Sequence, residues 1–299
     1  MAARDPPGVG APAAGGLVLT DARDIVVAYQ GEAGAYSEEG AQTLWPDGDL
    51  RPYASIRKVF EAVEVGRADF GLVPMENSQA GSINETYDLF LKHGLHLVGE
   101  AIARVDHCLV ALPGTAPDDL DEVISHPQAI AQSEEFLHAL GVRIRADYDT
   151  AGAARRIADD KLERTGAVAS RRAADLYGLD VLAERIQTFP DNHTRFGALS
   201  RRPDPLGEAN KSSLVFGVGH VAGSLFRCLG AFAERHLNLN KLESRPRGGR
   251  PWEYVFYVDV EAPATAPAMV DALAEVSEHA TFTRLLGTYA SGLERRGPG

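Results

Sequence analysis

The sequence predicts an α/β fold, with a large region of alternating strands and helices followed by a smaller βαββαβ unit. Three observations support this prediction. Short apolar runs bounded by glycine or proline alternate with segments whose apolar residues follow helical spacing. The chain has 299 residues, of which 44% are hydrophobic, enough for more than one buried core. Composition changes at residues 201–211, where proline, glycine and charged residues indicate a linker.

The first part of the chain begins with an expected disordered leader at 1–23, rich in alanine, glycine and proline and without the apolar core of a signal peptide. Ser55 is the expected cap of a helix that ends at Gly66. Pro74 is expected to end the strand before it. The predicted elements are a strand at 24–29, helices at 36–45 and 56–65, a strand at 69–74, a helix at 82–92 and a strand at 95–105.

The alternation continues to residue 200, which favours a parallel or mixed sheet. This stretch predicts strands at 108–112, 122–125, 142–148, 166–170, 180–187 and 194–200, and helices at 128–140, 150–161 and 171–178. We place the large region at 24–202 and the linker at 203–211.

The small unit is placed at 212–290 and a tail at 291–299. Its order of elements is that of the ferredoxin-like unit. The predicted elements are a strand at 213–218, a helix at 223–235, strands at 237–243 and 253–260, a helix at 268–278 and a strand at 281–286.

The formal net charge of −12 gives a surface that repels nucleic acid and anionic membranes, so we expect neither as a partner. Cys108 and Cys228 belong to no C-x-x-C unit, which predicts neither a disulfide nor structural zinc and fits a reducing cytosol. His93 and His96 lack a third ligand at a matching spacing, so we expect no metal site. No apolar run approaches the length of a membrane span, and we expect a cytoplasmic protein.

Polar residues follow several strands, where α/β folds bind ligands. In "YQGEAGAYSEEGA", Ser37 lies at the start of a helix, where free N–H groups attract anions; taken alone, the pattern favours an ordinary strand-to-helix turn with Ser37 as a cap. In "VPMENSQAGS", Glu76, Asn77 and Ser78 follow a strand and Gly81 allows close backbone approach, although a self-capped loop is the alternative. Thr150 in "YDTAGAA" is a helix cap or a ligand donor.

The stretch "DNHTRF" places Asn192, Thr194 and Arg195 in a row. Arg195 can bind a carboxylate through two parallel hydrogen bonds, Thr194 is a neutral hydroxyl donor, and Asn192 can orient either. The alternative is a loop whose arginine pairs with a surface acid. The glycines of "FGVGHVAG" have a G-x-G-x-x-x-G spacing, which differs from that of a dinucleotide-binding loop.

Taken together, these stretches resemble the prephenate dehydratase family from about Ile25 to Leu286. The matching motifs are "GEAGAYSEEGA", "VPMENSQAGSINETYDL", "HCLVALPG", "SHPQAIAQ", "DTAGAA", "GAVAS" and "NHTRF". The small unit resembles an ACT domain, through "HVAGSLFRCLGAF" and "NLNKLESRP". The resemblance implies two α/β lobes similar to type 2 periplasmic binding proteins, with lobe 1 at about 24–104 and 190–202 and lobe 2 at about 105–189. The active site would lie between them.

The resemblance also implies the roles of individual residues, with no metal and no cofactor. Prephenate loses carbon dioxide and a ring hydroxyl, and Thr194 would donate to the departing hydroxyl. The implied catalytic set is Thr194, Arg195, Asn192 and Glu76, and the implied substrate-binding set is Ser37, Asn77, Ser78, Gly81, Thr150 and Phe196. Arg195 would grip a substrate carboxylate or hold the loop, and Glu76, beside a dianion, should be paired or protonated.

The resemblance further implies a homodimer or homotetramer that binds phenylalanine between ACT domains. The implied phenylalanine-binding residues are Ala222, Gly223, Ser224, Leu225, Glu243, Ser244, Arg245 and Pro246. Ala222 and Ser224 depart from the usual proline and alanine of this motif. The "GAYSE" form and Ser82-Ile83 look closer to arogenate dehydratases. Two alternatives therefore stay open: an arogenate dehydratase, and a non-catalytic amino-acid sensor.

Overall fold

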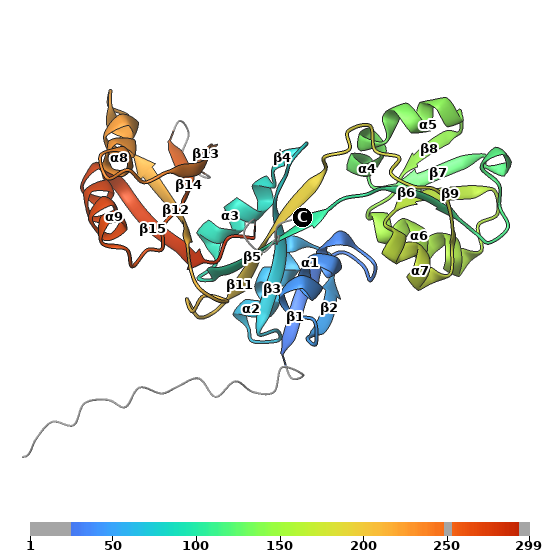
Figure 1. Cartoon of the computed structure of the whole chain (residues 1–299), viewed down its shortest axis with the longest axis horizontal. Coiled ribbons are helices and arrows are strands. Elements are labelled where there is room, and N and C mark those ends of the chain that lie inside the picture. Colours follow the sequence, from blue (N-terminus) through green and yellow to red (C-terminus); the bar gives the residue numbers. More distant parts are fainter. Residues whose placement is uncertain (1–24, 248–252, 293–299) are drawn as a thin grey trace, which may run out of the picture.

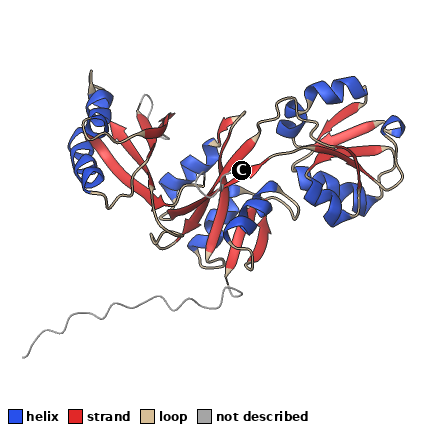
Figure 2. Ribbon diagram, viewed as in Figure 1, coloured by secondary structure: helices blue, strands red, loops and turns tan. Residues whose placement is uncertain are grey.

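The computed structural model of the chain describes residues 25–247 and 253–292. The leader expected at 1–23 and residues 293–299 of the expected tail lie outside the described residues. The described chain forms three sheets with helices packed on them, arranged as three bodies in a row (Figure 1). We name them lobe 1, lobe 2 and the C-terminal domain, and Figure 2 distinguishes their helices and strands. The expected α/β fold class is confirmed.

Lobe 1 contains a mixed sheet of order β2-β1-β3-β11-β5. β1 is parallel to β2 and β3, whereas β11 is antiparallel to both of its neighbours, β3 and β5. Ser55 caps α2 as expected, because its side chain accepts a hydrogen bond from the Lys58 amide. The elements are β1 (Val26–Gln30), α1 (Tyr36–Leu44), β2 (Asp49–Tyr53), α2 (Ile56–Glu64), β3 (Phe70–Asn77), β4 (Gly81–Ser82), α3 (Asn84–Lys92), β5 (His96–Arg104) and β11 (His193–Ser200).

Lobe 2 lies between β5 and β11 in the chain, so two connecting segments join it to lobe 1 (Figure 1). Its sheet has the order β10-β6-β9-β7-β8, with β7 parallel to β8 and β9. The elements are β6 (Cys108–Ala111), β7 (Glu122–Ser125), α4 (Pro127–Gln132), α5 (Glu134–Leu140), β8 (Arg143–Ala146), α6 (Thr150–Asp160), β9 (Thr165–Ala169), α7 (Arg171–Tyr177) and β10 (Asp180–Ala183).

The C-terminal domain has the expected βαββαβ order, with an antiparallel sheet of order β13-β14-β12-β15. Helices α8 and α9 pack on one face of this sheet around Phe216, Phe232 and Met269. The elements are β12 (Lys211–Val218), α8 (Ser224–Ala233), β13 (Leu239–Pro246), β14 (Tyr254–Val260), α9 (Pro267–His279) and β15 (Ala280–Tyr289).

The other face of that sheet shares a hydrophobic core with lobe 1. Tyr257 and Leu286 belong to the same buried cluster as Leu97 and Phe90. At Gly287 a Cβ atom would lie 1.7 Å from the carbonyl oxygen of Leu97, so β15 approaches the backbone of β5 as closely as a glycine permits. The C-terminal domain is therefore packed firmly on lobe 1 rather than held by the linker alone.

Several element boundaries differ from expectation. β3 continues through Pro74 to Asn77, because the proline sits beside an irregularity in the pairing of β3 with β11, where a missing N–H costs no ladder bond. The helix expected at 128–140 is interrupted at Ser133, which ends α4 and precedes α5. Strand β2, which was not predicted, lies at a sheet edge and contains Pro52, so its apolar signal is weak. Lys211, expected at the end of the linker, begins β12.

Three further strands were predicted with displaced ends. β10 stops at Ala183 rather than at residue 187, β13 runs from Leu239 to Pro246 rather than over 237–243, and β15 runs from Ala280 to Tyr289 rather than over 281–286. All three lie at the edges of their sheets, where one partner strand leaves less pattern in the sequence.

Candidate active site

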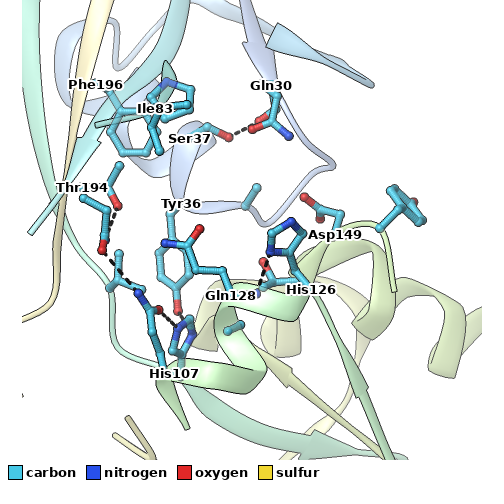
Figure 3. Close-up of a pocket in the computed structure, with 18 residues that line it drawn as sticks. Gln30, Tyr36, Ser37, Ile83, His107, His126, Gln128, Asp149, Thr194 and Phe196 are labelled. Atoms are coloured by element: carbon cyan, nitrogen blue, oxygen red, sulfur yellow. Dashed lines mark hydrogen bonds between the residues drawn. The ribbon is translucent and has the colours of Figure 1, made fainter. Parts of the chain in front are cut away.

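A cavity of about 180 Å³ lies between the two lobes (Figure 3). Both lobes contribute to its wall, so the two together form one site. The residues that line it are Gln30, Ala35, Tyr36, Ser37, Pro74, Asn77, Ile83, Val105, His107, His126, Gln128, Ala129, Gln132, Tyr148, Asp149, Thr150, Thr194 and Phe196.

Thr194 and Asn77 face each other across the pairing of β11 with β3. The Nδ2 atom of Asn77 donates to the Thr194 hydroxyl at 3.1 Å and to the Asn192 Oδ1 atom at 2.7 Å. The Oδ1 atom of Asn77 accepts from the amides of Gln79 and Ala80, which fixes the orientation of the side-chain amide. Because the Thr194 oxygen accepts this bond, its own proton is available to a group in the cavity.

A chain of hydrogen bonds extends from this pair into lobe 2. Gln132, the last residue of α4, donates to Asn77 Oδ1 at 3.3 Å and accepts at its Oε1 atom from Asn192 at 3.0 Å. The same oxygen bonds His107 Nε2 at 2.8 Å, so the ring carries its proton on Nε2. Asn192 is fully buried. This series of hydrogen bonds therefore couples the orientation of the Asn77 and Thr194 side chains to the position of lobe 2.

His107 stands at the far end of this chain, where its Nδ1 atom lies 3.2 Å from the Tyr36 hydroxyl. Burial lowers the pKa of His107, against a raising effect of the hydrogen bond to Gln132. Burial also raises the pKa of Tyr36 well above its usual value. At neutral pH both groups are uncharged, so they supply hydrogen bonds rather than charge to the cavity.

The beginnings of two long helices, α1 and α6, reach the cavity at Tyr36, Ser37 and Thr150. The first N–H groups of a helix have no partner within the helix, and the helix dipole makes this end attractive to anions. Among the described residues that line the cavity, none is Lys or Arg. An anion here would therefore be held by dipoles and neutral donors.

Asp149 is the acid of the cavity wall. Its Oδ1 atom accepts from the Gly152 amide at 2.8 Å as the cap of α6, and burial raises the pKa of its carboxyl group. The Oδ2 atom lies close to Gly31 of lobe 1. This carboxylate is thus placed at the boundary between the lobes.

The two lobes are in direct contact beside the cavity. A Cβ atom at Gly34 would lie 2.8 Å from the Cα atom of Ala173, and Ser170 donates to the Gly34 carbonyl at 2.7 Å. Tyr148 and Arg155 of lobe 2 both bond Glu32 of lobe 1, each at 2.9 Å. These contacts hold the lobes closed over the site.

Arg195 and Glu76 lie outside the cavity lining, although Glu76 is paired as expected. They pair with each other across β11 and β3 at the rung next to Thr194 and Asn77, and their side chains point away from the cavity. Arg195 instead bonds Asp259 of the C-terminal domain at 2.6 Å. The reason is the two-residue period of a strand, which turns neighbouring side chains to opposite faces. The expected grip of Arg195 on a substrate carboxylate is not available in this arrangement.

The other expected substrate-binding residues divide into two groups. Ser37, Thr150 and Phe196 line the cavity together with Asn77. Ser78 bonds the backbone of residues 191 and 193 and lies outside the lining, as does Gly81. Ser78 therefore shapes the segment that carries Thr194 rather than facing the cavity.

Comparison with known proteins decides the family. Residues 27–204, more than half of the chain, match the family model for prephenate dehydratase. The chain belongs to the prephenate dehydratase family. Residues 212–278 match the model for the ACT domain, which covers most of the C-terminal domain. The predicted resemblance is thus confirmed in both parts of the chain.

Within this dehydratase family, the chain is 46% identical over 281 residues to arogenate dehydratase 1 of Petunia hybrida, covering 88% of this chain and 66% of that protein. It is 45% identical over 276 residues to arogenate dehydratase/prephenate dehydratase 2, chloroplastic, of Arabidopsis thaliana, covering 89% of this chain and 72% of that protein. The chain thus spans about two thirds of the length of the first of these relatives. A crystal structure of prephenate dehydratase from Arthrobacter aurescens in complex with L-Phe superposes with a TM-score of 0.83, 30% identity and 92% coverage of each chain.

The residues expected to bind phenylalanine do not converge on one described pocket. Ala222, Gly223, Ser224 and Leu225 line a separate open pocket at the start of α8. On β13, Glu243 bonds Ser82 and Arg245 bonds Asp88, so these two side chains face lobe 1. Ser244 and Pro246 lie on the exposed side of the strand.

Thirteen of the 18 residues that line the cavity were not predicted as site residues, and four of them take part in the contacts described above. Gln132 and His107 lie in the motifs "SHPQAIAQ" and "HCLVALPG", where a glutamine or histidine alone gives no local signal. Tyr36 and Asp149 precede expected site residues by one position. The described ranges contain no group of three or more His, Cys, Asp or Glu arranged to hold a metal ion. Nor does any helix in them have the length and apolar character that a membrane span requires.

Proposed function

We propose that this protein catalyses the decarboxylative dehydration of prephenate to phenylpyruvate, in phenylalanine biosynthesis. The observation that carries the proposal is the Thr194 hydroxyl, which accepts from Asn77 at 3.1 Å and keeps its proton for a group in the cavity. The family model and the Arthrobacter aurescens structure support the same reaction.

In this reaction the electron pair of the bond to the ring carboxylate moves into the ring as carbon dioxide leaves. The ring hydroxyl departs with its electron pair and must gain a proton to become water. Aromatisation supplies the driving force, so the barrier lies in the poor leaving group. Thr194 donates to the departing oxygen, and a positioned donor of this kind contributes about 10²–10⁴-fold.

The substrate is a dianion, and apart from Asp149 the described cavity wall offers it neutral side chains and helix starts. The starts of α1 and α6 and the Thr150 hydroxyl are the proposed partners of the carboxylates, and Ser37, whose hydroxyl donates to the Gln30 carbonyl, contributes from the start of α1. Phe196 supplies an apolar wall for the ring. Asn77, Asn192 and Gln132 act as positioning residues that keep the Thr194 hydroxyl aimed at the leaving group.

A specific observation favours a second substrate, arogenate. Arogenate carries an amine where prephenate has a ketone, and Asp149 puts a carboxylate on the cavity wall. The name of the Petunia hybrida relative agrees with this alternative, and the name of the Arabidopsis thaliana relative includes both activities. Under it, the same site would release phenylalanine directly.

One experiment separates these readings. Purified protein is mixed at neutral pH with prephenate and, in parallel, with arogenate, and phenylpyruvate and phenylalanine are quantified. A higher kcat/KM with prephenate is the expected result, and a higher value with arogenate promotes the second candidate. Folded protein that turns over neither substrate refutes both and leaves the amino-acid sensor as the explanation.

We also propose that phenylalanine regulates the enzyme through the C-terminal domain, in a homodimer or homotetramer, and that the enzyme is cytoplasmic. The ACT match and the L-Phe complex of the Arthrobacter aurescens protein support the first part. The location rests on the sequence, and a chloroplastic relative is the contrary indication. Calorimetric titration with millimolar phenylalanine, and light scattering with and without it, test binding and assembly; a flat titration refutes the regulatory proposal.

A further inference from the structure

The strands that carry the proposed donor also reach the C-terminal domain. On β11 and β3, the rung of Thr194 and Asn77 faces the cavity, and the next rung, of Arg195 and Glu76, faces the opposite way. Side chains one residue apart on a strand point to opposite faces of the sheet. A displacement of the second rung is therefore transmitted through one peptide unit per strand to the first.

The second rung belongs to a group of six charged residues that we call the interdomain charge cluster. Lobe 1 contributes one residue from each of three adjacent strands, β3, β11 and β5, and the C-terminal domain contributes one from each of β12, β13 and β14. Three members are acids and three are bases, so the cluster is neutral as a whole. The members are Glu76, Glu100, Arg195, Lys211, Lys241 and Asp259.

Arg195 is at the centre of the cluster. Its Nη1 atom donates to Asp259 at 2.6 Å and to Glu100 at 3.2 Å, and its Nη2 atom to Glu76 at 3.3 Å and to the Tyr87 hydroxyl at 3.2 Å. The buried Nε atom has no hydrogen-bond partner within residues 25–247 and 253–292. The position of this guanidinium group is therefore set by the carboxylates around it, of which Asp259 is nearest.

Five members of the cluster are shielded from water, and Glu76 is 37% exposed at its edge, so the central pairing is costly to disturb. The side chains of Arg195, Asp259 and Glu100 are 12%, 7% and 2% exposed. Lys211 bonds Glu100 at 2.8 Å and lies 3.6 Å from Asp259. Removing one member of such a group leaves the opposite charge buried without compensation.

We infer that Arg195 is a positioning residue, through which Asp259 of the C-terminal domain holds the Thr194–Asn77 rung in its productive geometry. This inference rests on the proposed function. It gives the neighbouring polar residues of "NHTRF" separate tasks, with Thr194 on the substrate side of the sheet and Arg195 on the regulatory side. It also places the C-terminal domain in the active conformation of the site, not only in its regulation.

Strand β13 extends this connection to the predicted effector motif. Lys241 bonds Glu76 at 3.1 Å and the Ser82 hydroxyl at 2.6 Å. Glu243 and Arg245, two and four residues further along the strand, contact lobe 1 on the same side. A shift of β13 on ligand binding would therefore change the pairing of Glu76, which precedes Asn77 in the chain.

The test compares two substitutions that each remove one carboxylate between lobe 1 and the C-terminal domain. Asp259→Asn removes the negative charge that pairs with Arg195 and leaves a neutral hydrogen-bond acceptor in its place. Asp88 lies on α3 and pairs with Arg245 of β13 at 3.1 Å, and this pair does not touch the second rung. Asp88→Asn therefore removes a carboxylate from the same interface but away from Arg195. We expect Asp259→Asn to lower kcat by about tenfold to a hundredfold with KM changed less than about threefold, the size of a misplaced catalytic group. Asp88→Asn should keep the kcat of the wild type, and Asp259→Glu should restore part of the loss.

Hydrogen exchange of the peptide spanning 190–198 gives a readout that needs no turnover. Faster exchange in Asp259→Asn than in wild type, with no change in Asp88→Asn, supports the inference. This holds even if the wild type reacts with neither prephenate nor arogenate. That outcome would refute the proposed function and leave the inference standing. Wild-type kcat and exchange in Asp259→Asn overturn the inference, as do equal losses in both variants. If Asp259→Asn does not fold, Arg195→Lys, which keeps the charge but loses the forked contacts with Asp259 and Glu76, replaces it under the same criteria.

Discussion

Replacing Thr194 with valine removes the hydroxyl and keeps the branched shape that a strand favours. The structure indicates that this change acts on the donor alone. Asn77 Nδ2 keeps its bonds to Asn192 at 2.7 Å and to the His193 carbonyl at 3.2 Å, so the amide stays oriented without the threonine oxygen. The substitution therefore tests the donated proton with little disturbance of its surroundings.

The expected loss follows from what the donor does. Removing a single donor that stabilises charge in the transition state costs about 10²–10³ in kcat, or about 2.7–4 kcal/mol. KM should change less than about threefold, because the departing hydroxyl gains its charge only in the transition state. Thermal stability should stay close to that of the wild type.

The assay is steady-state formation of phenylpyruvate from prephenate, or of phenylalanine from arogenate, with Thr194→Ser as the matched control. Serine keeps the hydroxyl and loses one methyl group, so it should retain most of the activity that valine loses. A kcat for Thr194→Val within about threefold of the wild type would refute the donor role. Equal losses in both variants would point instead to the packing of β11.

Three further predictions concern charge, pH and closure. Asp149→Asn, which keeps the cap on Gly152, should lower kcat/KM for arogenate by about tenfold relative to prephenate; an unchanged ratio of the two would exclude a contact with the amine. Burial raises the pKa of Glu39 from 4.5 to about 7, so the folded state binds more protons and wild-type stability falls as pH rises through this range. The free energy of unfolding in urea should therefore be measured for Glu39→Gln and the wild type, and the difference should shift in favour of the variant by roughly 1–3 kcal/mol between pH 4.5 and pH 8. A difference in unfolding free energy that does not depend on pH would contradict the raised pKa of Glu39. Gly34→Ala, whose Cβ would meet Ala173, should raise KM about tenfold by opposing lobe closure, whereas Gly178→Ala, with a similar positive φ and nothing within 4 Å, should not; equal KM values would argue against closure as the cause.

The order and type of most elements could be predicted because each has a strong local pattern. The helix capped by Ser55 and the apolar runs of the central strands are examples. Elements without such a pattern were missed or misplaced, such as the edge strand β2 with its proline and the interruption at Ser133. Edge strands and helix breaks depend on partners that are distant in the sequence.

The site was predicted in part for the same reason. Asn77 ends a strand, Thr194 lies near the start of another, Ser37 and Thr150 lie at the starts of helices, and the fold brings all four to one cavity. The sequence could not predict what the Arg195 side chain contacts. Side chains alternate along a strand, so Arg195 and Thr194 must point to opposite faces of the sheet, but the sequence does not say which face the C-terminal domain covers. That information lies in the pairing of Arg195 with Asp259, 64 residues away.

Gln132 and His107 show a different limit. Each is an ordinary residue in its own segment, and its place in the site depends on a hydrogen bond to another element. Gln132 becomes informative only when α4 of lobe 2 is placed beside Asn192. No local pattern in the sequence indicates which residues are hydrogen-bonded to one another in this series.

The dipolar character of the cavity has a consequence for product release. The substrate of the proposed reaction enters with two negative charges, and the product leaves with one, because a carboxylate departs as neutral carbon dioxide. Helix starts and hydroxyl groups, with no described Lys or Arg in the wall, bind each carboxylate with modest strength. Loss of one charge then removes a large share of the attraction at the moment when the bond breaks. The chemical step itself loosens the hold on the product, and the site is cleared for the next molecule.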